Sequence, residues 1–324
     1  MLRTLALVAL ALLCATAPGR APAQPAQQLV RMGTASLAGA YFPVGVALCR
    51  LVNEDRPTHG IRCAAQPSAG SVANIRALRA EEIDLALVQS DVQEAALHGA
   101  GALAEDGAFP ELRAVLSLYP ETLTVVARRD AGISGLGDLP GKRISPGPPG
   151  SGQRGLWDAV ATGMGWTADT FASVLELEPT DQADALCRGL IEAFVIVIGH
   201  PAATVREATG GCDAVIVPVT GAEVATLLAA NPAFAEAAIP GGIYAGNPAP
   251  IPSFGVLATV VTRAGVADLV IAEFVQSAFG KLDVLRTLDP VLAGLEPEAM
   301  ATTGLTAPLH PAAAAYFQSR GWVP

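Results

Sequence analysis

The nine residues IDLALVQSD, at positions 83–91, contain a strand and the beginning of a helix. Ile83 to Val88 is almost continuously apolar, as expected for a strand that is covered on both faces, and Asp91 stands at the position of a helix N-cap. The same order of apolar run, short polar turn and helical spacing recurs on both sides of this stretch. It predicts an α/β fold with a mostly parallel sheet.

This alternation extends over most of the chain. Strands are expected at 29–32, 61–65, 83–88, 112–118, 123–127, 142–145, 174–177, 193–198, 214–219 and 254–262, with helices between them. The chain has 324 residues, of which 51% are hydrophobic, and this length favours two lobes. We predict a first lobe formed by 28–127 with 255–324, a second lobe formed by 128–254, and crossings between them at 123–128 and 254–262.

The charge of the chain limits its partners. Charged residues make up only 15%, which argues against a coiled coil and against long disordered tails. Twenty Lys and Arg stand against 30 Asp and Glu, so the formal net charge is −10. Because an acidic surface repels phosphate backbones, nucleic acid is not expected as a partner.

The N-terminus is typical of an exported protein. Arg3 precedes an apolar run from Leu5 to Leu13, and Ala21-Pro22-Ala23 offers a cleavage site, so residues 1–23 are predicted to be a signal peptide that is removed after Ala23. A retained membrane anchor is the alternative. Removal takes away two arginines and leaves 18 basic against 30 acidic residues, a net charge of −12. We expect a soluble protein in the periplasm.

Four cysteines remain after residue 23, and none lies in a Cys-x-x-Cys pair. An even number in an exported protein is compatible with two disulfides. We predict Cys49–Cys63 and Cys187–Cys212, because each pair lies within one lobe and leaves the lobes free to move. Buried free thiols are the alternative.

Small and polar residues follow the strands at 33–43, 66–74, 89–91 and 147–154. In open α/β sheets, ligands bind beyond the carboxyl ends of the strands, where loops run into helix N-termini that favour anions. Tight turns with helix caps are the alternative for each segment. Together they predict a binding cleft between the lobes, formed by Gly33, Thr34, Ala35, Ser36, Tyr41, Ser68, Ser71, Asn74, Gln89, Ser90, Ser151, Gly152, Gln153 and Arg154.

Some roles follow from chemistry. Tyr41 offers an aromatic wall and a phenolic donor, or is an ordinary core aromatic. Gln89 and Ser90 can hydrogen-bond a carboxylate, whereas Asp91 suits a cap. Arg154 can pair with a ligand carboxylate through two hydrogen bonds, or forms a salt bridge that faces solvent. Ser68, Ser71 and Asn74 serve either as ligand donors or as caps.

The sequence contains no pattern that predicts catalysis. Residues 147–152 lack the lysine of a phosphate-binding loop, and no Gly-x-Ser-x-Gly is present. The four histidines, at 59, 98, 200 and 310, have no metal-ligand spacing. We therefore predict no catalytic residues, no metal and no cofactor, with a periplasmic enzyme as a minor alternative.

The chain resembles the TAXI subfamily of TRAP transporter solute receptors. The resemblance rests on motifs that occur in order along the chain: Gly33-Thr34 leading to Tyr41-Phe42-Pro43-Val44-Gly45, then Ser68 to Ile75, Gln89-Ser90-Asp91, Ser117-Leu118-Tyr119-Pro120-Glu121, Pro149 to Arg154, Ile239-Pro240 and Pro308-Leu309-His310-Pro311. Ala35, Ser36, Ala38 and Ala69 replace glycines of the family pattern, and a Cβ at these positions narrows the approach of the backbone to a ligand.

The resemblance implies a two-lobed periplasmic binding protein fold, type II-like, with the ligand in the cleft between the lobes. It implies a monomeric receptor that delivers a small anionic or zwitterionic solute, such as a glutamate-like amino acid, a dicarboxylate or an oxo acid, to the membrane permease subunits of a TRAP transporter. A sensor or scavenger on the same fold is the alternative. The replaced glycines prevent the identity of the solute from being inferred.

Overall fold

The structure is a computed structural model that describes residues 27–324 except 38 and 232. The predicted signal peptide, 1–23, lies outside the described residues. No helix in the described part of the chain is long and apolar enough to cross a membrane.

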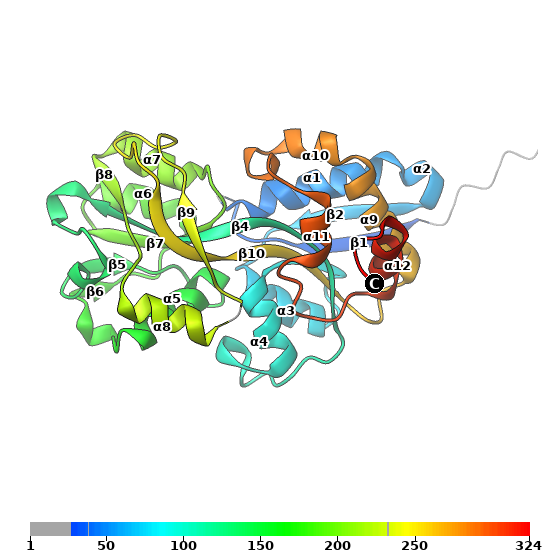
Figure 1. Cartoon of the computed structure of the whole chain (residues 1–324), viewed down its shortest axis with the longest axis horizontal. Coiled ribbons are helices and arrows are strands. Elements are labelled where there is room, and N and C mark those ends of the chain that lie inside the picture. Colours follow the sequence, from blue (N-terminus) through cyan, green and yellow to red (C-terminus); the bar gives the residue numbers. More distant parts are fainter. Residues whose placement is uncertain (1–26, 38, 232) are drawn as a thin grey trace, which may run out of the picture.

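The strands form one sheet of ten, in the order β2-β1-β3-β10-β4-β7-β5-β6, with β8 beside β4 and β9 beside β10. The strands are β1 Gln28–Gly33, β2 Ile61–Gln66, β3 Leu85–Gln89, β4 Leu112–Arg128, β5 Arg143–Ser145, β6 Ser173–Val174, β7 Ala193–Ile198, β8 Ala214–Val217, β9 Ala235–Ile239 and β10 Ile251–Arg263. In Figure 1, β4 and β10 run through the whole molecule and join two halves.

Helices cover both faces of the sheet in each half (Figure 1). The first half contains β1 to β3 with α1 Tyr41–Glu54, α2 Arg56–His59, α3 Ser71–Arg79, α4 Ser90–His98, α9 Asp268–Gly280, α10 Leu282–Leu288, α11 Pro297–Thr302 and α12 Pro311–Arg320. The second half contains β5 to β9 with α5 Gly152–Gly163, α6 Pro179–Cys187, α7 Ala203–Gly211 and α8 Ala222–Ala230.

Strand β3 shows why the sheet is covered on both sides. Leu85 and Leu87 face a core that is shared with α1 and α9, whereas Ala86 and Val88 face a second core that is shared with α3 and α4. Successive side chains of a strand point to opposite faces, so an apolar run of this kind needs a partner layer on each face. The expected α/β architecture is therefore observed.

The expectation of a mostly parallel sheet is wrong. The pairs of β1 with β2 and β3, and of β5 with β6 and β7, are parallel. Strands β4 and β10, however, are antiparallel to every strand that they pair with. The reason is that these two strands do not belong to βα repeats, since they carry the chain from one half to the other and back.

The two apolar runs expected at 112–118 and 123–127 are one continuous strand, β4. Pro120 lies in its middle and cannot donate a backbone hydrogen bond, and the register between β4 and β10 shifts nearby, between Leu257 and Thr259. From Thr122 onward β4 pairs with β7. The segment 117–121 thus lies where the two halves meet.

Two disulfides are present, Cys49–Cys63 and Cys187–Cys212, and these are the pairs that the sequence analysis selected. The first joins α1 to β2, and the second joins the last residue of α6 to the residue after α7. Each lies within one half, so neither ties the halves together.

Candidate functional site

A cavity lies between the two halves, at the carboxyl ends of β1, β2, β3 and β5. It leaves about 60 Å³ for the centres of water-sized molecules, which corresponds to roughly four to six waters. We call it the cleft. It is lined by Ala35, Ser36, Gly39, Ala40, Tyr41, Ala69, Gly70, Ser71, Gln89, Glu121, Pro148, Ser151, Gly152, Gln153, Glu178, Pro179, Ile196, Val197 and Ile198.

Tyr41 and Glu121 form the buried polar centre of the cleft. Tyr41 is the first residue of α1, and its hydroxyl donates a 2.6 Å hydrogen bond to Glu121 Oε2 on β4. Only 6% of Tyr41 and 3% of Glu121 is exposed. Burial raises the pKa of Glu121 to about 8, although hydrogen bonds from Tyr41 and Gln89 act in the opposite direction. Burial also holds the pKa of Tyr41 well above its usual value.

Two helix N-termini meet at the cleft, one from each half. Helix α3 begins at Ser71 after Gly70, whose φ of 108° suits glycine, and α5 begins at Gly152. Ser151 caps α5, since its hydroxyl accepts a hydrogen bond of 3.1 Å from the backbone N–H of Arg154. The first N–H groups of a helix have no acceptor within it, so both helices present donors where a solute anion can bind.

The predicted site residues divide into two groups. The first group lines the cleft and consists of Ala35, Ser36, Tyr41, Ser71, Gln89, Ser151, Gly152 and Gln153. The second group lies outside the cleft wall and consists of Gly33, Thr34, Ser68, Asn74, Ser90 and Arg154.

Most of the second group supports the loops of the cleft. Asn74 Nδ2 donates to the carbonyl oxygens of Thr34 and Leu87, at 2.7 and 2.8 Å, and Ser68 Oγ donates to the Thr34 carbonyl at 2.9 Å. Ser90 Oγ accepts from the backbone N–H of Leu257 at 3.1 Å. These side chains bind backbone of their own half, and Asn74 and Ser68 fix the loop that follows β1.

Arg154 takes part in salt bridges on the outside of α5. Its guanidinium contacts Asp158, at 2.9 Å, and Glu176. It is absent from the cleft wall, so the structure matches the salt-bridge alternative rather than the carboxylate-binding one. Both acids come from the same half as Arg154, one from its own helix and one from the segment before α6.

Several residues of the cleft wall were not among the predicted site residues. Glu121 and Glu178 are the most important, and the others are Gly39, Ala40, Ala69, Gly70, Pro148, Pro179 and 196–198. Glu121 carried a signal in the sequence, because it is the one ionisable acid within the run 112–127. An acid is rarely placed in a buried strand without a partner or a function.

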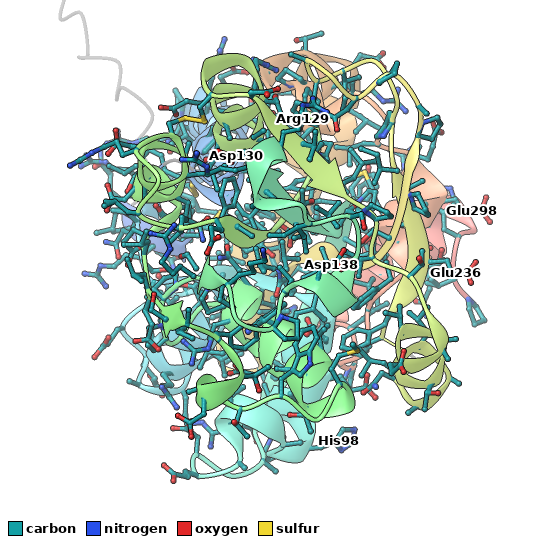
Figure 2. The ribbon with its side chains drawn as sticks, turned by 90° about the vertical axis from the view of Figure 1, so that its left-hand side faces the viewer. His98, Arg129, Asp130, Asp138, Glu236 and Glu298 are labelled. Atoms are coloured by element: carbon teal, nitrogen blue, oxygen red, sulfur yellow. A yellow bond between two sulfur atoms is a disulfide. The ribbon has the colours of Figure 1, made fainter. Side chains whose placement is uncertain are left out.

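Potential metal ligands and the charged residues of the outer surface can be located in the described residues. The described residues contain no group of His, Cys, Asp and Glu side chains that could hold a metal ion. Figure 2 views the second half end-on: Arg129, Asp130 and Asp138 lie on the outer surface of this half, and His98 projects from the first half below it. Arg129 there contacts Asp213 at 2.8 Å.

Comparison with known proteins identifies the family of this chain. A sequence model of the NMT1-like family matches residues 32–321. The chain belongs to the NMT1-like family. The NMT1-like family is a broader assignment than the TAXI subfamily. The family model, like the TAXI motifs, extends over nearly the whole described chain.

Solved structures share the fold at low sequence identity. A protein from Bordetella bronchiseptica RB50 is 14% identical with a TM-score of 0.56, covering 90% of this chain and 98% of its own. A histidine kinase sensor domain with similarity to periplasmic binding proteins is 15% identical, with a TM-score of 0.52 and coverage of 84% and 99%. The alkanesulfonate-binding protein SsuA from Xanthomonas axonopodis pv. citri is 18% identical, with a TM-score of 0.49 and coverage of 93% and 96%. The likeness to the histidine kinase sensor domain, together with the two halves seen here, shows that this member of the NMT1-like family has the two-lobed periplasmic binding protein fold.

Proposed function

We propose that the protein is an extracytoplasmic receptor that binds a small solute in the cleft and delivers it to the membrane permease of a TRAP transporter. The observation that carries the proposal is the cleft itself, because both halves contribute a helix N-terminus to one small cavity. Membership of the NMT1-like family and the fold support it. The TRAP partner rests on the TAXI resemblance of the motifs.

The mature chain in this proposal is a periplasmic monomer that starts after Ala23. Its lobes correspond to 28–127 with 255–324 and to 128–254, and β4 and β10 connect them. The solute bears a carboxylate, which accepts hydrogen bonds from the N-termini of α3 and α5. The protein acts by binding and release, and no bond of the solute is changed.

A sensor is the second candidate function. The observation that favours it is the fold shared with a histidine kinase sensor domain, which this chain matches over 99% of that domain's length. A sensor and a transport receptor bind the solute in the same way and differ in the protein that reads the closed form. Uptake of the solute by cells that do or do not express the associated permease separates the two.

Native mass spectrometry of protein isolated from the periplasm tests the proposal directly. We expect an adduct of low mass, because a closed cleft retains its solute. A thermal-shift screen of carboxylates then identifies the class, since a solute at 100 times its dissociation constant stabilises the folded state by about 2.7 kcal/mol. Absence of any adduct, together with no stabilisation by any small solute, would contradict the receptor function.

A further inference from the structure

The charges that face the cleft are of one sign. No Lys, Arg or His belongs to the described cleft wall, whereas two carboxyl groups do. Glu121 is buried in the interior, and Glu178 is exposed at the N-terminus of α6. The nearest candidate for a positive group, Arg154, is already occupied by Asp158 and Glu176. A solute with two negative charges would find no cationic side chain here to compensate its second charge.

Hydrogen-bond acceptors also belong to the cleft wall. Tyr41 donates its single hydroxyl proton to Glu121, so its oxygen can only accept further hydrogen bonds, and Ser71 provides one of them. Gln89 is 3% exposed, and its side-chain oxygen has no hydrogen-bond partner among the described residues. Glu121 adds a buried carboxyl group, which accepts hydrogen bonds from Tyr41 and Gln89. A buried acceptor without a donor, such as the Gln89 oxygen, is rare in folded proteins and indicates that a donor binds there.

An ammonium group supplies what these acceptors lack. It carries three N–H donors and no acceptor, and its positive charge compensates the Glu121 carboxylate. A carboxylate or keto oxygen of a solute would instead place an acceptor against the unpartnered Gln89 oxygen. The backbone donors of the cleft are those at the N-termini of α3 and α5.

The remaining wall is apolar and leaves little space. Pro179 and the strand residues Ile196 to Ile198 contribute apolar surface to this wall, together with alanines at 35, 40 and 69. A long or charged side chain finds neither the volume nor a partner there. A short aliphatic side chain fits both the size and the polarity of this wall.

We propose that the cleft selects small aliphatic α-amino acids, with the ammonium group on Glu121, Gln89 and Tyr41 and the carboxylate at the N-termini of α3 and α5. The proposal rests on the receptor function and narrows it. Among the solutes that suit an anion-binding cleft, it excludes dicarboxylates and oxo acids and disfavours amino acids with an acidic side chain. Glu121 is thereby a specificity-determining residue.

Calorimetric titration of solute-free protein with matched pairs tests this inference. The pairs are L-alanine with pyruvate, L-valine with 2-oxoisovalerate and L-glutamate with 2-oxoglutarate. Each pair differs in the amine and keeps the carboxylate. We expect alanine or valine to bind at least tenfold more tightly than its oxo acid, and more tightly than glutamate.

Glu121→Gln keeps the size of the side chain and removes its charge. It should weaken binding of the preferred amino acid at least tenfold and reduce the preference for the amine. Glu176→Gln is the matched control, because Glu176 faces Arg154 outside the cleft, and it should leave both quantities unchanged. If Glu121→Gln does not fold, the wild-type ratio of amino acid to oxo acid still decides.

The outcomes separate the inference from the receptor function on which it rests. Equal or tighter binding of the oxo acids or of glutamate overturns the inference and leaves the receptor function intact. Retention of the full amine preference by folded Glu121→Gln also overturns it. If no small solute binds to the wild type, both fail.

Discussion

The backbone N–H of Ala73 donates a hydrogen bond of 3.3 Å to the carbonyl oxygen of Gly150, and this bond joins the two halves of the protein across the cleft. Close contacts surround it: a Cβ built on Gly70 would lie 3.5 Å from the Cα of Ser151. The halves therefore touch at the starts of α3 and α5, on one side of the cleft. We expect this contact to open when a solute enters, which implies movement along β4 and β10.

Gly152→Ala tests this closure. A Cβ at Gly152 would overlap the side-chain oxygen of Gln89 and approach Ser71 Oγ to 2.8 Å. Gln89 would have to turn away from the cleft that it lines, or the halves would have to separate. We expect solute affinity to fall roughly tenfold or more, and the radius of gyration with saturating solute to stay near the solute-free value.

Gly155→Ala is the control for Gly152→Ala. Gly155 lies about one turn further along the same helix, and a Cβ at this position would meet no atom within 4 Å. Its affinity should stay within about twofold of the wild type, since alanine favours helix. Full closure of the Gly152→Ala protein in small-angle scattering would contradict the proposed contact.

Arg154→Ala should leave solute binding within about twofold of the wild type. The guanidinium is engaged by Asp158 and Glu176 and does not line the cleft. A direct bond to a charged solute would instead cost about 1.5–3 kcal/mol on removal. Partly exposed salt bridges contribute about 0–1 kcal/mol each, so the expected change in unfolding free energy is small. Calorimetric titration of wild type and variant with the same solute distinguishes an unchanged affinity from a loss of this size.

The strand-to-helix junctions could be predicted because each follows from local chemistry. Strand β3 ends at Gln89 and α4 begins at Ser90, within two residues of the position that the apolar run and Asp91 indicated. The meeting of these junctions at one edge of the sheet follows from the parallel order of β1 to β3. Eight of the predicted residues accordingly line the cleft.

The role of each polar residue could not be predicted, because it depends on distances between segments. The Asn74 side chain can hydrogen-bond a solute as well as it can hydrogen-bond backbone. Only the positions of the Thr34 and Leu87 carbonyl groups show that it holds the loop after β1. Glu121 was missed for a related reason. Its neighbours suggested the end of one strand and the start of another, whereas Pro120 is accommodated within β4 by a register shift.

Reduction of the disulfides should destabilise the halves and leave the cleft intact. Cys49 and Cys63 are 14 positions apart, and Cys187 and Cys212 are 25 apart. Loop closure of this length stabilises by about 3 kcal/mol for each bond. We expect Cys49→Ser with Cys63→Ser, and the corresponding change at 187 and 212, each to lower the unfolding free energy by about this amount, measured by urea titration. Peptide mapping without reduction that finds a bond between the two pairs would contradict the assignment.

His200 should make the protein sensitive to acid. Its Nδ1 lies 2.6 Å from the Tyr244 hydroxyl and its Nε2 lies 3.0 Å from Thr124 Oγ1. Thr124 donates its proton to the carbonyl of Thr122, so Nε2–H is the donor, and Nδ1 accepts from Tyr244. Both bonds thus suit a neutral ring, and burial lowers the pKa of His200 to about 4.

The sign of the effect follows from that lowered pKa. The folded state binds the His200 proton less tightly than the unfolded state, so its contribution is complete above pH 6.5 and is lost as the pH falls towards 4. The loss amounts to about 3 kcal/mol at the lower limit. The unfolding free energy, measured by urea titration at pH 7 and 4.5, should decline more for the wild type than for His200→Gln. His98→Gln, at an exposed histidine, should decline as the wild type does.

Binding of an amino acid should strengthen as the pH rises from 6 to 8. Burial raises the pKa of Glu121 to about 8, so the free protein carries a proton there at pH 6. An ammonium ion binds the ionised carboxylate, and binding must therefore release that proton. Affinity increases by up to tenfold for each pH unit below 8 and levels off above it. Calorimetry at pH 6.5 in buffers of different ionisation enthalpy should show release of about one proton.

Other titrating groups near Glu121 must be distinguished from it. Tyr41 and Tyr119 have pKa values held well above 10 by burial, so both stay protonated throughout this range. Asp91 titrates within it, because burial raises its pKa to about 7, and its charge raises the pKa of Glu121. Glu178, at the mouth, and Asp289, which acts on Tyr119, are the remaining acids nearby. Asp91→Asn should keep the pH dependence, with its midpoint moved to lower pH, whereas Glu121→Gln should abolish it. A pH dependence that persists in Glu121→Gln and disappears in Asp91→Asn would assign the released proton to α4 instead of the cleft.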